Sequence, residues 1–211
     1  PREWIDQFDA LIFDECHQAK AESINMIGQK MSKAWFRIGT TGTLDQAQAH
    51  RLSIEGILGP AIQFIQTKNL MNKGLLATLG IDAILLKYSE AEKELLKKQR
   101  YPDEIKWLIS NDRRNEFIRD LALSTKGNTL VLFNYVEGQG KPLHSLIKAA
   151  AGDRKVYLIY GKTDADAREY IRRVIDTEKN AILVASYGTT SAGINIVNLD
   201  NIIFASPTKS V

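Results

Sequence analysis

The sequence predicts an α/β protein with mostly parallel strands. Short apolar runs alternate along the chain with stretches of helical periodicity, and this order is typical of repeated strand–helix units. Several of the runs are continuous apolar blocks, as in strands covered on both faces. The chain has 211 residues, of which 44% are hydrophobic and 25% are charged. That composition suffices for one large domain or two small ones and excludes a disordered or low-complexity protein.

The expected strands are short apolar runs bounded by polar residues or glycine. In chain order they are 10–13, 34–38, 61–65, 80–86, 129–133, 155–160, 181–185 and 201–205. The expected helices lie between them, at 22–31, 46–58, 67–72, 90–100, 113–124, 141–150 and 164–177. In the last of these, Ala167, Ile171, Val174 and Ile175 recur at helical spacing and form an apolar stripe.

A domain boundary is expected near 74–80, where Lys73 and Gly74 end a short helix before the next strand. The chain then divides into residues 1–78 and residues 79–211. No apolar run approaches the ~20 residues that a membrane span needs, so no membrane partner is expected. The net charge of +3 permits a polyanionic partner without requiring one.

The strongest chemical signal is the acidic pair Asp14 and Glu15. Four apolar residues, 10–13, lead directly into it, so both carboxylates follow the carboxyl end of a buried strand. Ligands bind at that edge in open α/β sheets. Asp14 can hold Mg²⁺, directly or through water, and Glu15 can orient and deprotonate an attacking water, as nucleotide phosphoryl transfer requires. The alternative is that the pair begins an ordinary solvated loop.

The next two residues, Cys16 and His17, are a weaker signal. As a zinc site they would supply at most half of the ligands, and the chain has no CxxC or HxxxH partner for them. Cys16 is the single cysteine, so an intramolecular disulfide is excluded and a reducing cytoplasm is expected.

Residues 14–17 read DECH, which resembles motif II of the superfamily 2 DExH-box helicases. After a predicted helix and strand, residues 38–44 (IGTTGTL) resemble motif III, whose hydroxyls can bond the acidic motif and pass the nucleotide state to a second motor domain. The resemblance assigns catalysis to Asp14, Glu15 and His17, Mg²⁺ binding to Asp14, and coupling to Thr41 and Thr43. The alternative for the two threonines is a Gly-Thr turn that caps the following helix.

Three later segments continue the resemblance. Residues 129–134 resemble motif IV, residues 157–163 with Arg168 resemble the segment that lies along the nucleic-acid backbone, and residues 182–195 resemble motif V. Backbone N–H groups and hydroxyls at such strand ends can bond phosphate oxygens without reading bases. The resemblance assigns nucleic-acid binding to Gly161, Lys162, Arg168, Thr189, Thr190 and Ser191, and coupling to Gly193 and Asn195. The alternatives are ordinary loop chemistry for Thr189, Thr190 and Ser191, and a turn with positive φ at Gly161 and Gly193.

The implied fold consists of two RecA-like parallel-sheet lobes, both incomplete. Residues 1–78 would be the C-terminal part of motor domain 1, and residues 79–211 the N-terminal part of motor domain 2. The implied activity is that of an ATP-driven DNA translocase, with ATP as substrate and Mg²⁺ as cofactor. Several of these segments also resemble phage helicases of recombination and replication-fork repair, most densely at the DECH run and at residues 39–44. That resemblance implies branched DNA as the substrate and the cytoplasm of an infected bacterium as the location.

The sequence departs from the family in three ways. No GxxxxGK[ST] phosphate loop occurs, no QxxGRxxR arginine-finger motif occurs, and Asn195 stands where many relatives carry Asp. We therefore expect a central fragment of a helicase that has no significant ATPase activity alone. Because the first lobe would lack strands, we also expect an exposed sheet edge that pairs with a second copy.

Two other classes of function remain open. One is a motor with another role on the same fold, such as the motor subunit of a restriction enzyme or an RNA helicase. The other is a non-enzymatic α/β nucleic-acid-binding module in which the DECH run has no catalytic role.

Overall fold

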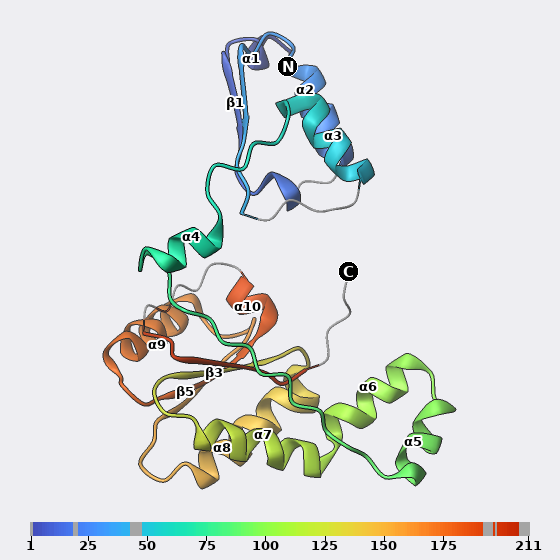
Figure 1. Ribbon diagram of the computed structural model, residues 1–211, viewed down its shortest axis with the longest axis vertical. Helices are drawn as coiled ribbons and strands as arrows, with labels where there is room; N and C mark the ends of the chain where they lie inside the picture. The colour runs from blue at the N-terminus through green and yellow to red at the C-terminus, as the bar shows by residue number, and fades with distance from the viewer. Residues whose placement is uncertain (1, 19–20, 43–47, 192–195, 197, 207–211) are drawn as a thin grey trace. The chain divides into compact units, whose positions relative to one another are not determined.

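The computed structural model describes residues 2–18, 21–42, 48–191, 196 and 198–206. The chain forms two compact units, Pro1–Asp82 and Ala83–Val211. Figure 1 shows both of them, and each is described separately below. The division follows Asp82, whereas the sequence predicts one after residue 78. None of the described helices combines the length and the apolar composition needed to cross a membrane.

Unit 1 is built on a parallel pair of strands. β1 (Ala10–Phe13) pairs with β2 (Phe36–Gly39) so that Ala10 lies opposite Phe36 and Phe13 opposite Gly39. The helices of this unit are α1 (Arg2–Ile5), the 3₁₀ turn Cys16–Gln18, α2 (Ala21–Lys30), α3 (Gln48–Leu58) and α4 (Thr67–Asn72). The unit thus follows the predicted alternation of strand and helix as far as α3.

Close approach of helices and strands makes the small core of unit 1. Cys16 and Ile54 are buried together, with Phe13, Ile57 and Leu58 packed against them. Two glycines permit this packing. A Cβ on Gly28 of α2 would overlap Ile57 of α3, and one on Gly39 would lie 2.6 Å from the Leu58 Cδ1.

One face of the β1–β2 pair carries exposed apolar side chains. Ile12, Phe36 and Ile38 share that face, since alternate residues of a strand point the same way and the register sets Ile12 opposite Ile38. Their exposed fractions are 67%, 65% and 48%. Parallel strands are normally covered on both faces, so this face is an apolar surface that the described residues of unit 1 leave exposed.

Two predicted strands, 61–65 and 80–86, are wrong. Both segments lack secondary structure, and neither pairs with any strand among the residues that the structure describes. Their apolar side chains are exposed, Phe64 to 86% and Leu85 to 88%. An apolar run becomes a strand only where a neighbouring strand and a core receive it, and neither is available to these segments.

The predicted helix 90–100 is too long at its C-terminal end. It ends as α5 (Glu90–Lys97), and a second helix that the sequence analysis missed follows as α6 (Tyr101–Ser110). Pro102 lies in the first turn of α6, where its missing N–H costs no hydrogen bond and its fixed φ suits a helix start. The proline therefore begins a new helix here.

Unit 2 contains a four-stranded parallel sheet in the order β4-β5-β3-β6. The strands are β3 (Thr129–Phe133), β4 (Val156–Ile159), β5 (Ile182–Ser186) and β6 (Asn201–Phe204). The remaining elements are α7 (Asp112–Ser124), the π-helix Val136–Gly140, α8 (Lys141–Ala150), α9 (Ala165–Thr177) and α10 (Tyr187–Ser191). The sequence predicts every one of these strands to within a residue or two.

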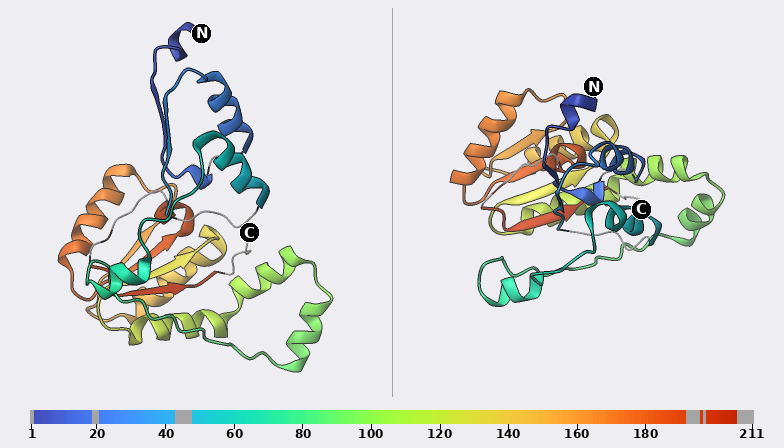
Figure 2. Two further views of the ribbon diagram at one scale, coloured as in Figure 1. Left: turned by 45° about the horizontal axis from the view of Figure 1, so that its top comes forward. Right: turned by 90° about the horizontal axis from the view of Figure 1, so that it is seen from above.

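Helices cover both faces of this sheet, as Figures 1 and 2 show. On one face, Val131 and Val184 of the strands pack with Ile118 of α7 and Ile147 of α8. On the other face, Leu130, Leu132, Leu183 and Ala185 pack with Ile175 of α9. The continuous apolar blocks of β3 and β5 are fully buried because both of their faces lie in a core.

Candidate nucleotide and nucleic-acid sites

The acidic motif of unit 1 follows β1 directly and is held against the residues that follow β2. The Thr40 N–H donates to the Phe13 carbonyl at 2.8 Å, and the Cys16 N–H donates to the Thr40 carbonyl at 3.0 Å. The Thr40 hydroxyl donates to the Asp14 Oδ1 at 2.8 Å, and the same oxygen accepts the Glu15 N–H at 3.0 Å. The β1–β2 register therefore brings the DECH and Gly-Thr segments together at the carboxyl edge of the strands.

Thr40 is a contact that the sequence does not predict, because the resemblance assigns Thr41 and Thr43 of the same Gly-Thr run. The feature that selects Thr40 is the register between β1 and β2, which the sequence alone does not reveal. Since Phe13 lies opposite Gly39, the residues that come next, Asp14 and Thr40, must be neighbours.

His17 connects the two segments a second time. Its Nδ1 lies 2.6 Å from the Thr41 Oγ1 and 3.2 Å from the Glu15 Oε2. The His17 side chain is 23% exposed and that of Glu15 is 55% exposed, so the pair stands at the surface. Glu15, His17 and Thr41 thus form one polar group, in which Thr41 contacts His17 and His17 contacts the Glu15 carboxylate. Thr43 lies outside the described residues.

Glu15 has a left-handed backbone, with φ of 48°. It is the sole non-glycine residue with positive φ in the part of the chain that the structure describes. This conformation is uncommon for a side chain larger than glycine and is found mainly where neighbouring contacts enforce it, often at functional sites. Here the Asp14 carboxylate accepts the Glu15 N–H, which contributes to holding that conformation.

Cys16 belongs to the core and not to the polar group. Its side chain is 3% exposed and packs with Ile54 and Leu58. Burial raises the pKa of the Cys16 thiol, and a raised pKa disfavours the thiolate that would ligate zinc. Within the described ranges, no cluster of three or more His, Cys, Asp or Glu side chains is arranged to hold a metal ion.

The Asp14 carboxylate is exposed and can serve Mg²⁺ in another way. Mg²⁺ often takes only one or two protein carboxylates, and waters and substrate phosphates complete its six ligands. A single surface carboxylate at a strand end fits that pattern and needs no protein cluster.

In unit 2, two predicted contact segments share the carboxyl edge of the sheet. Gly161 and Lys162 follow β4, while Thr189 and Thr190 lie in α10 after β5, and β4 and β5 are neighbours. Around Gly161, the Tyr160 N–H donates to the Thr163 hydroxyl at 3.0 Å and closes a turn. Both Gly161 and Lys162 are exposed at this turn.

Gly161 does not adopt positive φ, and a Cβ added to it would meet no atom within 4 Å. The alternative explanation, a left-handed turn that requires glycine, is therefore wrong for Gly161. Gly193, the other position of that alternative, lies outside the described residues.

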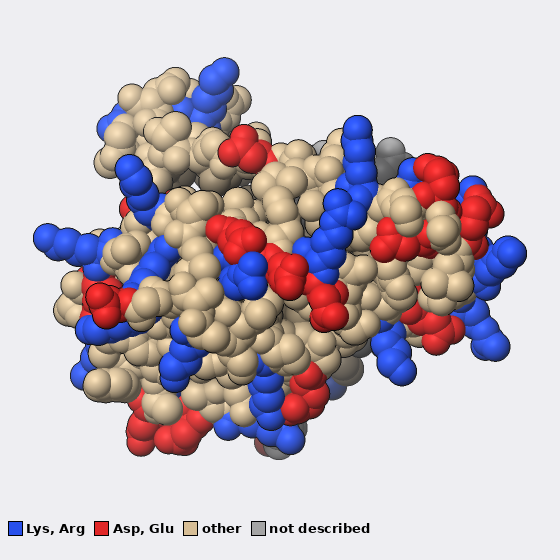
Figure 3. Space-filling model, turned by 90° about the horizontal axis from the view of Figure 1, so that it is seen from below, with Lys and Arg blue, Asp and Glu red and all other residues tan. Residues whose placement is uncertain are grey.

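Arg168 lies in the first turns of α9, half-buried. Its Nε is shielded from solvent and has no hydrogen-bond partner in the described structure. Over the face drawn in Figure 3, Lys and Arg side chains are mixed with Asp and Glu, and no continuous basic stripe is seen. Any nucleic-acid contact on that face therefore depends on particular residues.

Thr189 and Thr190 use their hydroxyls within the turn. The Thr189 Oγ1 lies 2.6 Å from the Ser186 Oγ, and Thr189 is only 3% exposed. The Thr190 hydroxyl donates to the Tyr187 carbonyl at 3.0 Å. This geometry is the local loop chemistry stated above as the alternative, so backbone N–H groups are better candidates here than the side chains. Ser191 ends α10, and Asn195 lies outside the described residues.

Comparison with known proteins adds two findings. The family model described as the type III restriction enzyme, res subunit, matches residues 2–46, which include the DECH and Gly-Thr segments. The ATP-dependent DNA helicase uvsW of Enterobacteria phage T4 is 33% identical over 213 aligned residues, which cover 100% of this chain. The chain spans 42% of the length of that relative. The similarity extends over both units and confirms that this chain resembles the superfamily 2 helicases of the UvsW type.

Proposed function

We propose that the chain is the central part of an ATP-dependent DNA helicase motor. Residues 1–78 would contribute motifs II and III of the first RecA-like motor domain, and residues 79–211 motifs IV and V of the second. The observation that carries the proposal is the hydrogen-bonded group after β1 and β2, in which Thr40 holds Asp14 and His17 bridges Glu15 and Thr41. The similarity to an ATP-dependent DNA helicase along the whole chain supports it.

In this proposal the acidic residues act on a nucleotide. Asp14 would hold Mg²⁺, and the ion when bound would neutralise charge on the nucleotide phosphates. Glu15 would orient and deprotonate the attacking water. His17 and Thr41 would link the position of Glu15 to the Gly-Thr segment, and Thr43 would extend that coupling. A change at the nucleotide would then move residues 40–43 through two short hydrogen bonds.

The nucleic-acid partner in this proposal is DNA, and its branched forms are the substrate of the whole protein. Gly161, Lys162 and Arg168 would contact phosphates, and the N–H groups of 189–191 would add further contacts. Gly193 and Asn195 would couple these contacts to the nucleotide. Such contacts predict sequence-independent binding that weakens as salt rises. The site of action would be the cytoplasm of an infected bacterium.

The test is phosphate release with DNA and Mg-ATP. It compares this chain with a version that is extended at both ends to the length of the uvsW helicase. The present chain spans 42% of that length. We expect turnover by the extended protein and a fall in kcat of about 10²–10⁴-fold on Glu15→Gln. The short chain should show no significant turnover, since a missing arginine finger alone costs about 10³–10⁵ in rate.

Glu22→Gln in the first turn of α2 is the matched control, because it removes the same charge from an exposed residue that has no described hydrogen bond to Asp14, Glu15, His17 or Thr41. It should leave kcat unchanged. Full activity of the extended Glu15→Gln protein would reject the role of Glu15. Turnover by the short chain that Glu15→Gln abolishes would reject the expectation that this part is inactive alone.

A second candidate is the motor of a restriction enzyme, which the match of residues 2–46 to the res-subunit model favours. Cleavage of DNA by the extended protein would support it over a helicase. Stimulation of ATP hydrolysis by RNA instead of DNA would indicate an RNA helicase. If Asp14→Asn left the extended protein fully active, a non-enzymatic binding module would be the better description.

A further inference from the structure

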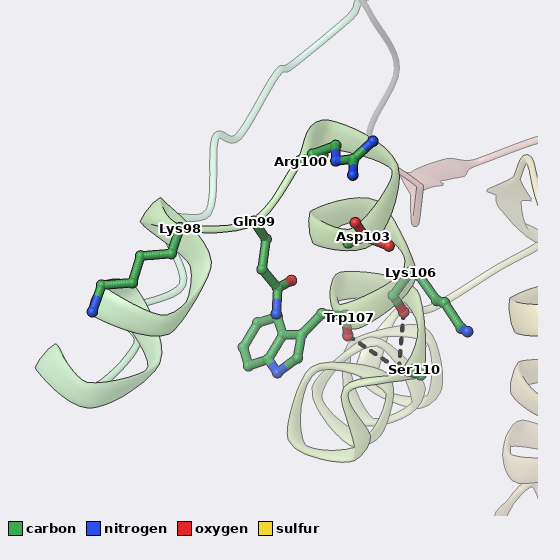
Figure 4. Close-up of a pocket in the computed structure, with 7 residues that line it drawn as sticks. All are labelled: Lys98, Gln99, Arg100, Asp103, Lys106, Trp107 and Ser110. Atoms are coloured by element: carbon green, nitrogen blue, oxygen red, sulfur yellow. Dashed lines mark hydrogen bonds between the residues drawn. The ribbon is translucent and has the colours of Figure 1, made fainter.

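A hollow of about 500 Å³ lies between α5 and α6 in unit 2, away from the sheet edge discussed above. Figure 4 shows Trp107 and Gln99 at its centre, with their side chains directed towards each other and longer charged side chains around them. The residues that line it are Lys98, Gln99, Arg100, Asp103, Lys106, Trp107 and Ser110. No motif of the sequence analysis includes these residues.

The charge of the hollow is positive and is not neutralised by ion pairs. Lys98, Arg100 and Lys106 line the hollow together with a single carboxylate, that of Asp103, and Figure 4 shows the Lys98 and Lys106 amino groups directed outward from Trp107. None of the three basic side chains forms an ion pair with another described residue. The lysines of α5 outside the hollow differ. The Lys93 Nζ lies 2.7 Å from a Glu90 oxygen, and the Lys97 Nζ lies 2.5 Å from a Glu94 oxygen. The lysines of α5 therefore form ion pairs with glutamates, whereas the basic side chains that line the hollow do not.

Arg100 occupies a position that helix stability does not explain. It is the N-cap residue of α6, where Ser, Thr, Asp or Asn would satisfy a free N–H, and its side chain makes no capping bond. A cation at a helix N-terminus is also disfavoured by the helix dipole. A residue that breaks local preference without a packing gain indicates a role outside the fold.

Trp107 provides an aromatic wall that is held in place. The Tyr88 ring packs edge-to-face on it with 5.4 Å between ring centroids, and Trp107 is half-buried. Beside it, the Gln99 Oε1 is shielded from solvent and has no hydrogen-bond partner in the described structure. The Ser110 hydroxyl is engaged elsewhere, donating to the Lys106 carbonyl at 2.9 Å.

We propose that this hollow binds single-stranded nucleic acid. Lys98, Arg100 and Lys106 would bind successive phosphates, and a base would lie against Trp107 beside the Gln99 amide. Cations that follow a backbone, combined with an aromatic side chain for the bases, are the usual means of binding single strands without reading sequence. The bases of a duplex are stacked inside it and cannot reach such a wall, so a single strand is favoured.

Tryptophan fluorescence of the 211-residue chain tests the proposal. The chain has three tryptophans, so Trp4→Phe and Trp35→Phe leave Trp107 as the sole reporter. We titrate this variant at low salt with an oligothymidylate of about 12 nucleotides. Stacking predicts saturable quenching of Trp107. Lys106→Gln should weaken the binding three- to tenfold and reduce the steepness of log Kd against log salt by about 0.7, the value for one phosphate contact on a single strand.

Lys97→Gln is the matched control, because it removes the same charge from a lysine that is paired outside the hollow. It should change the quenching curve by less than twofold. Lys162→Gln separates this site from the proposed motor contacts, because it should weaken total binding, measured by anisotropy, and leave the Trp107 curve unchanged. Three results would overturn the proposal: no quenching at saturating oligonucleotide, equal effects of Lys97→Gln and Lys106→Gln, or equal quenching by a duplex or by a phosphoserine peptide of matched charge.

Discussion

Arg154 shows how a single side chain can hold several segments of unit 2. Its Nη1 donates to the carbonyls of Ala122 and Thr125, each at 2.9 Å, and its Nη2 donates to the Gly127 carbonyl at 2.8 Å and the Thr129 hydroxyl at 3.0 Å. These bonds close the end of α7 onto the start of β3. Burial lowers the pKa of the Arg154 guanidinium, yet its ordinary pKa is so high that it keeps its charge.

We predict that Arg154→Lys destabilises the chain by about 2–4 kcal/mol, because one ammonium cannot reach all of these acceptors and leaves buried carbonyls unpaired. The free energy of unfolding from urea titration measures this. Arg173→Lys is the control, since Arg173 is 73% exposed and pairs only with Glu169 among the described residues. It should change stability by less than about 1 kcal/mol. Equal effects of the two substitutions would contradict the role of Arg154.

At the candidate site, the residue types were easier to predict than their contacts. Asp14 and Glu15 stand out in the sequence because an apolar run leads into them. Thr40 does not, because three threonines share its segment and only the register between β1 and β2 selects it. Thr189 has a suitable residue type, but burial directs its hydroxyl into the turn.

At the scale of elements, two glycines in neighbouring helices should respond oppositely to the same substitution. Gly28 of α2 packs against Ile57 of α3, so a Cβ there would overlap that side chain, whereas one on Gly56 of α3 would meet no atom within 4 Å. Gly28→Ala should destabilise by about 1–2 kcal/mol, because overpacking outweighs the gain in helix propensity. Gly56→Ala should stabilise by about 0.5–1 kcal/mol.

Thermal unfolding in a Trp107→Phe background, followed by the fluorescence of Trp4 and Trp35, measures both glycine effects in unit 1. A stabilising Gly28→Ala would show that α2 and α3 are not in close contact.

The helix α9 should carry a pH-dependent contribution from Glu169. Hydrogen bonds from Arg172, and then from Arg173, lower the pKa of the Glu169 carboxyl to about 2. A lowered folded-state pKa means that the stabilisation is complete above the unfolded pKa of about 4.5 and is lost as pH falls towards 2. The difference in melting temperature between the wild type and Glu169→Gln should therefore be constant above pH 5 and shrink below pH 4.5.

Carbon-detected NMR titration of the Glu169 carboxyl provides the direct measurement. A midpoint close to the ordinary value of 4.5 would contradict the ion-pair network.

At the scale of the whole molecule, self-association remains a prediction, and the exposed apolar face of the β1–β2 pair in unit 1 is the reason for it. Ile12 and Phe36 expose 67% and 65% of their surfaces on the same face of the β1–β2 pair, and the outer edge of each strand pairs with no other strand among the described residues. We expect sedimentation velocity to show dimers or larger species as the concentration rises. The double change Ile12→Thr and Phe36→Thr should shift the chain towards monomer, while Leu95→Thr on α5 should not. A monomer at high concentration would contradict this expectation.

The sequence by itself determined the parallel α/β class, the order of strands and helices in unit 2 and the position of the acidic pair, because apolar runs, helical stripes and a carboxylate at a strand end are local patterns. The tertiary structure decided what depends on distant neighbours. It left 61–65 and 80–86 without strand partners, joined Thr40 to Asp14 and His17 to Thr41 across the register, and gathered Lys98, Arg100, Lys106 and Trp107 around one hollow. A strand, a hydrogen bond and a pocket each need a second segment in the right place, and the second segment is specified by packing and not by the local residues.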